Sequence, residues 1–245
     1  MNTPPRRLLA LDTATEACSV ATWVDGVVQS QYAELGRGHG ERILPMIDAA
    51  LASAKLRLAQ LDAIAFGCGP GGFTGVRLAC SVTQGLAFGA QLQVVPISNL
   101  RALAARALQL APAAQQVWVC ADARMREVYF AVYGRGRDAS AELVGTEAVG
   151  PAATALAHFR ESKSGVPNRS DLALAGRGWQ AYSELLDAAG VVKQQGAAVF
   201  DALLPSAEDI VRLGVRDTSA GLARPASGAL PVYLRDNVAV AAPAP

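Results

Sequence analysis

One stretch of the chain, residues 63–88 (AIAFGCGPGGFTGVRLACSVTQGLAF), constrains the fold more than any other. Its apolar run 64–66 predicts a buried strand, and a tight Gly/Pro turn follows over residues 67–72. A helix is then predicted from an N-cap at Thr74 to about residue 89. We interpret this helix first as a packing surface and only second as a ligand site.

Small side chains recur every four residues along this predicted helix. They are Gly75, Ala79, Thr83 and Ala87. Residues four apart lie on one face of a helix, so the four form a stripe. A stripe of small side chains allows another helix to approach closely, which predicts a helix–helix contact here.

The glycines of the turn also match a nucleotide-binding pattern. Gly67, Gly69 and Gly72 fit G-x-G-x-x-G between a strand and a helix, which is formally the dinucleotide fingerprint. The context disagrees, because this is not the first strand and Gln91 and Gln93 stand where the acidic residue belongs. A P-loop is excluded, since no Gly-Lys-Ser/Thr follows. The favoured interpretation is a tight turn whose backbone amides can at most hold an anion weakly.

The composition limits the class of protein. A length of 245 residues fits one large domain or two of ordinary size. No run reaches the roughly 18 apolar residues of a membrane span, and MNTPPRR lacks the apolar core of a signal peptide, so we expect a cytoplasmic protein. The net charge of +1 does not favour strong nucleic-acid binding by the chain alone.

Cysteine and histidine usage argues against a metal or protease site. The four cysteines form no C-x-x-C pair, and Cys18 and Cys120 lie in strand-like runs, which predicts buried free thiols. Only two histidines are present, so a His-rich metal site is excluded. His39 and Glu41 do not complete a ligand set or a protease triad, and we interpret them as decorating a helix start.

The order of predicted elements repeats, which suggests two domains, 1–110 and 111–236, with a break at residues 111–114. Strands are predicted at 7–12, 18–24, 27–33, 64–66, 93–96, 116–122, 127–133, 142–149 and 171–175, and helices at 41–55, 74–89, 99–110, 151–161, 179–189 and 205–215. Residues 217–228 are expected as loop, 231–236 as a terminal apolar anchor and 237–245 as a disordered tail. Each half opens with three strands, the first ending in Asp12 or Asp122. A cleft lined by these strand ends is expected between the halves.

Several segments, spread from residue 8 to residue 236, together resemble a known family. They are LLALDTATEACSVAT, GERILPMID, GCGPGGFTGVRLACSVTQGLAFG, CADARMREVYFAVY and PVYLRD. The chain resembles the TsaB (YeaZ) family of bacterial accessory subunits for making threonylcarbamoyladenosine in tRNA. This resemblance implies an α/β protein with the actin-like fold of sugar kinases, Hsp70 and actin. Two RNase-H-like halves are implied, each a mixed sheet flanked by helices, with the second half reduced.

The resemblance also implies a role without catalysis. Family members bind and activate TsaD, a paralogue that transfers the threonylcarbamoyl group to the adenosine beside the anticodon, and the ATPase TsaE joins the pair. A homodimer is implied for the chain alone, with tRNA contacted only indirectly through the complex. A surface such as Arg124 and Arg126 is our own hypothesis for that contact, since the near-neutral charge disfavours direct tRNA binding by the chain alone. No tightly bound cofactor and no catalytic residue is implied, while ATP or ADP at the interface with TsaD stays open. The alternative is an ATP-binding phosphotransferase or ATPase of the same fold.

Compared with TsaD, the chemical site is eroded. The metal-binding histidines of TsaD-like proteins are replaced by the segment 96–103, where Arg101 would repel a divalent cation. Asp12, Thr13 and Thr15 retain the look of a first phosphate loop. Alternatively, Asp12 and Thr13 hold the loop through hydrogen bonds from their side chains to the backbone. The Gly-rich adenosine loop is represented by 176–179, which includes a bulky Arg and Trp.

The family likeness assigns partner binding to the predicted helices 41–55 and 74–89, which pair with the same helices of the partner in a four-helix contact. The candidate interface residues are Ile43, Leu44, Ile47, Leu51, Gly75, Arg77, Ala79, Thr83 and Ala87. The alternative is that both helices merely cover the sheet, and a helix can do both because it has two sides.

Overall fold

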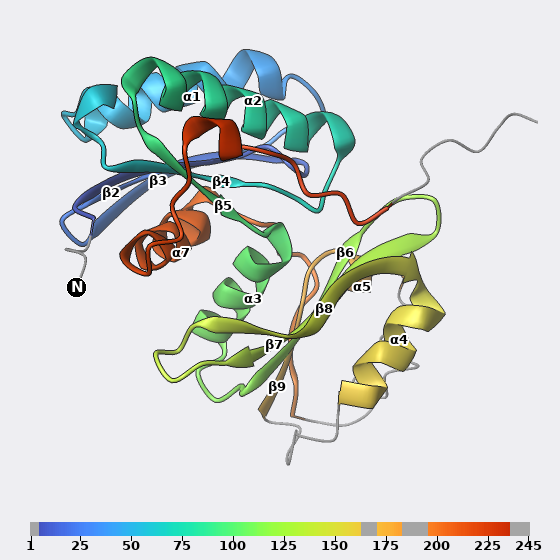
Figure 1. Cartoon of the computed structure of the whole chain (residues 1–245). Coiled ribbons are helices and arrows are strands. Elements are labelled where there is room, and N and C mark those ends of the chain that lie inside the picture. Colours follow the sequence, from blue (N-terminus) through green and yellow to red (C-terminus); the bar gives the residue numbers. More distant parts are fainter. Residues whose placement is uncertain (1–4, 163–170, 183–195, 236–245) are drawn as a thin grey trace, which may run out of the picture.

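The computed structural model describes residues 5–162, 171–182 and 196–235 (Figure 1). Within these ranges the chain forms two five-stranded mixed sheets, with strand orders β3-β2-β1-β4-β5 and β10-β9-β6-β7-β8. The strands of the first sheet are β1 Arg7–Asp12, β2 Ala17–Val24, β3 Val27–Glu34, β4 Ala63–Gly67 and β5 Gln93–Ile97. Those of the second sheet are β6 Gln116–Asp122, β7 Glu127–Arg135, β8 Ala141–Pro151, β9 Leu172–Ala175 and β10 Ala198–Phe200.

The two sheets have the same topology. In each, three consecutive strands pair antiparallel, and the fourth and fifth strands are added in parallel on the other side of the first. The predicted repeat of strand order is therefore confirmed. Asp25 and Gly26 form the hairpin turn between the strands predicted at 18–24 and 27–33, with φ of 47° and 96°. Strand β10 was not predicted, because a three-residue run carries no periodic signal.

Helices cover both faces of each sheet. They are α1 His39–Ser53, α2 Phe73–Ala90, α3 Asn99–Leu110, α4 Ala152–Glu161, α5 Gly178–Ala181 and α7 Ala207–Ser219, with 3₁₀ turns η1 Leu58–Gln60 and η4 Ala226–Gly228. Helices α1 and α2 lie side by side on one face of the first sheet and α7 lies on the other (Figure 1). Helix α3 packs on the second sheet, and α4 packs on β7 and β8.

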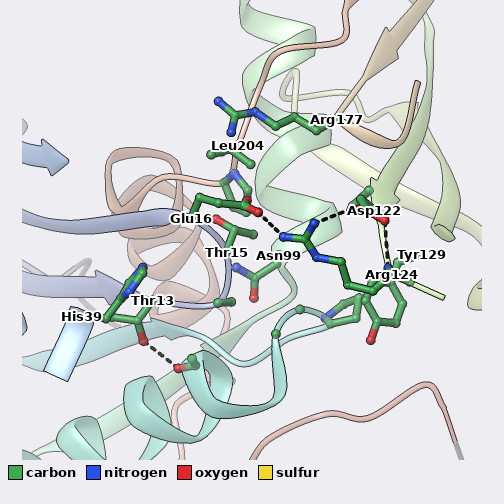
Figure 2. A pocket seen from close by; sticks show the side chains of 18 of the residues that line it. Thr13, Thr15, Glu16, His39, Asn99, Asp122, Arg124, Tyr129, Arg177 and Leu204 are labelled. Carbon is green, nitrogen blue, oxygen red and sulfur yellow. Dashed lines mark hydrogen bonds and ion pairs between the residues drawn. The ribbon is translucent and has the colours of Figure 1, made fainter. Parts of the chain in front are cut away.

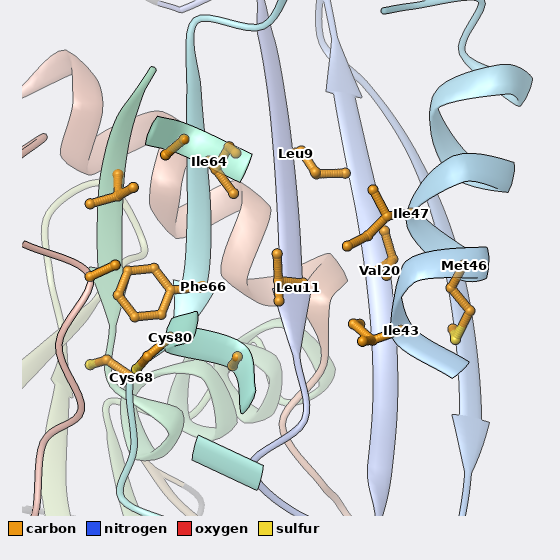
Figure 3. Close-up of a cluster of buried hydrophobic side chains, with 14 of the residues drawn as sticks. Leu9, Leu11, Val20, Ile43, Met46, Ile47, Ile64, Phe66, Cys68 and Cys80 are labelled. Carbon is orange, nitrogen blue, oxygen red and sulfur yellow. The ribbon is translucent and has the colours of Figure 1, made fainter. Parts of the chain in front are cut away.

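Strand β1 is buried on both faces, which explains its unbroken apolar sequence. Leu9 and Leu11 point toward α1 and α2, where they pack with Ile43 and Ile47 (Figure 3). Leu8 and Ala10 pack on the opposite side, against α7. A strand covered on both faces reads as a continuous apolar run rather than an alternating one.

The two predicted halves exchange helices. Helix α3 belongs to residues 1–110 in sequence, yet its leucines pack with Val117 and Val119 of the second sheet. Helix α7 belongs to residues 111–236, yet its Ile210 packs on the first sheet. Each half is therefore completed by a helix from the other half of the sequence, and this ties the two sheets together.

Several predicted boundaries are wrong. Helix α1 begins at His39 rather than at residue 41. Pro45 therefore lies in its second turn, where it removes one backbone donor. The N-cap of α2 is Gly72 rather than Thr74, and no side chain caps it. Helix α7 continues to Ser219, so residues 217–219 are not loop.

Some predicted segments end outside the described ranges. Helix α5 spans Gly178–Ala181 and so contains only residues 179–181 of the helix predicted at 179–189; residue 182 lies in a turn, and the residues from 183 onward are not described. The predicted tail 237–245 also lies outside the described residues. Residues 231–235 form neither helix nor strand, but the Val232 N–H donates to the carbonyl of Cys68 at 2.7 Å, so this segment is attached as expected.

The stripe of small residues on α2 faces inward. Ala79, Thr83 and Ala87 are fully buried within the chain. A Cβ atom on Gly75 would stand 2.0 Å from the carbonyl oxygen of Thr13. The stripe thus brings α2 close to its own sheet and to the β1–β2 connection, and the expected contact with another helix through these residues is wrong for this structure.

Two glycines of α2 provide a direct test of this packing. Gly75→Ala is expected to lower the free energy of unfolding by more than about 2 kcal/mol, because the methyl group overlaps backbone atoms. Gly85→Ala is the matched control: nothing lies within 4 Å of its Cβ position, so the same change should stabilise the helix by about 0.5–1 kcal/mol. Urea unfolding measures both, and equal effects would contradict the packing described here.

Candidate functional site

A cleft of about 790 Å³ lies between the two halves (Figure 2). Its walls come from the β1–β2 connection, the starts of α1 and α2, helix α3, and the β6–β7 connection. The predicted cleft is present, and Asp122 lines it as expected. A volume of this size lies within the range of about 300–1,000 Å³ that is typical of small-molecule sites.

Asp12 does not line this cleft, which corrects the expectation for the first strand end. Its side chain has no exposed surface. The Asn99 side-chain amide donates to Asp12 Oδ1 at 2.8 Å, and the Ala14 N–H donates to the same oxygen at 3.4 Å. Burial raises the pKa of Asp12 from 3.8 to about 6, although these hydrogen bonds oppose the rise.

Thr13 and Thr15 line the cleft but are engaged with the backbone. The Thr13 hydroxyl donates to the carbonyl of Gly75 at 2.6 Å. The Thr15 Oγ1 accepts from the Ala17 N–H at 3.2 Å. Both side chains stabilise the connection between β1 and β2. This fits the alternative to a phosphate loop, in which side chains hold the loop by hydrogen bonds to the backbone.

Ion pairs cross the cleft from one half to the other. Arg124 of the second half lies 2.5 Å from Glu16 of the first, and 3.2 Å from its own neighbour Asp122 (Figure 2). Arg177 pairs with Glu34 at 2.7 Å, and this hydrogen bond lowers the pKa of Glu34. The two carboxylates that line the cleft, Glu16 and Asp122, therefore share one arginine. The two pairs that cross the cleft join residues 108 and 143 positions apart in sequence, so no local pattern could have indicated them.

The space beside the glycines that suggested nucleotide loops is filled by other parts of the chain. A Cβ on Gly67 would meet Asp12 at 2.0 Å, and one on Gly69 would meet the carbonyl of Val232 at 2.6 Å. Gly176 and Gly178 leave the same kind of space for Cys120. In each case the absence of a side chain allows two parts of the chain to come into contact. For Gly67 and Gly69 this agrees with the tight turn predicted from the sequence.

The residues considered for metal or protease chemistry are dispersed. His39 lines the cleft as the first residue of α1, whereas Glu41 is exposed in the first turn. Arg101 forms a two-point ion pair with Asp217 at 2.6 and 2.9 Å rather than facing the cleft. Among the residues that the structure describes, no group of three His, Cys, Asp or Glu side chains is placed to hold a metal. All four cysteines are buried and free, which confirms the prediction made for Cys18 and Cys120.

The predicted interface residues divide between the core and the surface. Those inside the core are Ile43, Ile47, Ala79, Thr83 and Ala87, and Gly75 packs on Thr13. Leu44 (49% exposed) and Arg77 face outward, while Leu51 is half-buried. The outward face also carries Phe73 and Phe88, with Ser81 and Gly85 exposed between them, and the sequence analysis missed these positions.

Two sheets of identical topology that enclose a cleft and are flanked by helices define an α/β protein of the actin-like ATPase fold. Component A of (R)-2-hydroxyglutaryl-CoA dehydratase from Acidaminococcus fermentans shares this fold, with a TM-score of 0.50 over 88% of this chain and 99% of that one, at 9% identity.

The family follows from closer relatives, and the chain belongs to the TsaB (YeaZ) family. A family model described as "TsaD: tRNA N6-adenosine threonylcarbamoyltransferase" matches residues 25–242. The tRNA threonylcarbamoyladenosine biosynthesis protein TsaB of Escherichia coli is 40% identical over 95% of this chain and 96% of its own. The TsaB protein of Haemophilus influenzae is 39% identical over 94% of both.

A solved structure, YeaZ from Pseudomonas aeruginosa, is 42% identical to this chain. It superposes with a TM-score of 0.79 over 94% of this chain and all of that one. The family and the fold implied by the sequence motifs are therefore confirmed. No helix in the described part of the chain is both long and apolar enough to cross a bilayer.

The buried carboxyl of Asp12 predicts a pH dependence of stability. Its folded-state pKa of about 6 exceeds the ordinary 3.8, so the contribution of this carboxyl to stability is full below pH 4 and is lost as the pH rises through 6, by about 3 kcal/mol. Asp12→Asn keeps an acceptor for Asn99 without a charge. We expect its free energy of unfolding to exceed that of the unsubstituted chain by about 2–3 kcal/mol at pH 7.5 and to match it near pH 4.

Urea unfolding at both pH values measures this difference. Asp209, whose pKa burial raises to about 7, is present in both proteins and cancels in the comparison. Asp48→Asn, at an exposed position of α1, is the matched control and should leave the pH profile unchanged. An Asp12→Asn profile parallel to that of the unsubstituted chain would contradict the assignment.

Proposed function

We propose that this chain is a non-catalytic accessory subunit of tRNA threonylcarbamoyladenosine biosynthesis that binds and activates a TsaD-type transferase. One observation carries the non-catalytic part: Asp12, the carboxylate at the end of the first strand, is sealed from the cleft by Asn99 and has no exposed surface. A group that acts on a ligand must come within hydrogen-bonding distance of it.

The remaining cleft chemistry supports the same proposal. Glu16 and Asp122 both pair with Arg124. The Thr13 hydroxyl donates to a backbone carbonyl, and Thr15 Oγ1 accepts from a backbone N–H. Divalent cations prefer free carboxylate oxygens, and phosphate loops need accessible backbone or side-chain donors. We therefore propose that the cleft holds no tightly bound cofactor, with a nucleotide entering only where the partner completes a site.

The outer face of α1 and α2 is the surface we assign to the partner. It combines exposed Leu44, Phe73 and Phe88 with small Ser81 and Gly85 in the middle of α2. Large apolar side chains flanking small ones allow a helix of the partner to pack closely at the centre and be held at the ends. The buried members of the predicted interface support this face from beneath.

Family likeness extends the proposal to the assembly. We propose that the same face forms a homodimer when the chain is alone, that TsaE joins the pair with TsaD, and that tRNA is contacted only within the complex. A homodimer through a face that TsaD also uses would compete with the heterodimer, so the two should be mutually exclusive.

A reconstitution tests the function. Threonylcarbamoyladenosine formation would be assayed with TsaD, TsaE, the adenylate-forming enzyme and tRNA, with and without this chain, and the chain alone would be assayed for ATP hydrolysis. We expect product only when the chain is present and no hydrolysis by the chain alone. Robust hydrolysis by the chain alone would instead support the phosphotransferase or ATPase alternative.

A matched pair of leucines tests the surface. Leu44→Asp places a charge in the outer face and should weaken association with TsaD at least tenfold, because an unpaired carboxylate would be buried at the contact. Leu222→Asp, at a similarly exposed leucine (56%) that follows α7 on the other side of the first sheet, should have no effect. Equal affinities of the two variants would reject the assigned face.

A further inference from the structure

The connection between β6 and β7 is strained. Three consecutive residues, Arg124, Met125 and Arg126, have φ of 61°, 54° and 60°. Residues with a side chain adopt this left-handed region at a cost on the order of 1–3 kcal/mol each, and such strain concentrates at functional sites. The side chains of all three residues are exposed, and that of Met125 is 75% exposed.

The C-terminal segment holds the strained turn in place. The Arg235 guanidinium pairs with Glu127 and donates to the carbonyl of Ala123 at 3.1 Å. Its other terminal nitrogen lies 3.8 Å from the sulfur of Met125. On its other side, the turn is fixed by the ion pairs of Arg124 that cross the cleft. Contacts on both sides therefore hold the turn in this conformation.

The same C-terminal segment joins this turn to the start of α2. Two residues before Arg235, the Tyr233 hydroxyl accepts a hydrogen bond from Arg77 Nε at 2.6 Å. The Tyr233 ring stacks on Phe73 at 5.7 Å, and the Arg77 guanidinium lies 3.6 Å above the Phe73 ring. Figure 1 shows this last described stretch, in red, running from beside α2 toward the second half.

These contacts create one continuous surface, which we call the turn–tail surface. It consists of Phe73, Arg77, Met125, Arg126 and Tyr233, all exposed. Aromatic residues, methionine and arginine are the types enriched in protein–protein interfaces. Because Phe73 and Arg77 also belong to the outer face of α2, the turn–tail surface continues the face assigned to the partner onto the second half.

The charges favour a protein over RNA as the occupant. Arg77 is engaged with Phe73 and Tyr233, and Arg124 is neutralised by its carboxylates. Arg126 forms no ion pair with any residue that the structure describes. One free cation contributes little to phosphate binding, which relies on several. Arg126 lies beside the exposed Met125 on a surface that also carries two aromatic rings. Such a cation suits an ion pair with one carboxylate of a protein partner, at the edge of an apolar contact.

We propose that the turn–tail surface is a second contact for the TsaD-type partner, which reaches beyond α1 and α2 to the second half of this chain. The partner would provide an apolar pocket for Met125 and a carboxylate opposite Arg126. This inference rests on the proposed function, since it assigns a further site to the same partner. The strained backbone keeps Met125 and Arg126 in the orientation that the contact requires.

The test measures the affinity of the full-length chain for TsaD by calorimetry. Met125→Asn removes the apolar contact, and asparagine adopts the left-handed region more readily than methionine, so the turn should keep its conformation. Arg126→Glu reverses the free charge. We expect each variant to weaken binding about tenfold. Arg137→Glu, at an exposed arginine at the opposite end of β7, is the matched control and should bind as the unsubstituted chain does.

The outcomes separate this inference from the proposed function. If both turn variants bind TsaD with unchanged affinity while Leu44→Asp weakens binding, the inference is wrong and the accessory role stands. If none of the three variants weakens binding, the inference and the assigned outer face are both wrong, and the reconstitution decides the accessory role separately. If Arg126→Glu reduces the affinity of the assembled complex for tRNA but not the affinity for TsaD, the surface binds RNA and the inference is rejected.

Discussion

The structure depends on a set of hydrogen bonds centred on Asn99. Its side-chain amide donates to Asp12 at the end of β1, and its side-chain oxygen accepts from the Gly69 N–H at 2.8 Å. The Asn99 N–H returns to the carbonyl of Gly69 at 2.9 Å. One residue at the start of α3 thus joins a strand end, the turn before α2, and the helix that packs on the second sheet. Because these groups are buried, leaving any one unpaired would cost about 1–3 kcal/mol.

This arrangement links the fold to the absence of catalysis that we propose. In satisfying Asn99, Asp12 becomes a structural residue, and its raised pKa reflects burial rather than preparation for chemistry. The cleft is large enough for a small molecule, but the two carboxylates that line it form ion pairs with Arg124. We propose that the chain instead binds other proteins through its outer helical face and the strained turn, whose exposed side chains are not part of the core.

The sequence predicted strands and topology well, because β1, β4 and β6 are apolar runs bounded by turn residues and buried on both faces. It predicted the helix at 99–110, which begins where the Ser98 hydroxyl accepts from the Leu100 and Arg101 N–H groups. It could not orient the stripe on α2: a four-residue repeat of small residues fits close packing on a sheet as well as on a helix. Nor could it predict that Asp12 meets Asn99, 87 positions away, or that Arg124 to Arg126 adopt left-handed backbone, since both result from tertiary contacts.

The central claim is that this chain acts through its outer surface rather than through its cleft. Hydrogen–deuterium exchange of the full-length chain, measured alone and with saturating TsaD, tests it most directly. The account predicts slower exchange in peptides of α1 and α2, with unchanged exchange in the cleft-lining segment 13–16. Protection confined to the cleft-lining segments, with α1 and α2 unchanged, would contradict it.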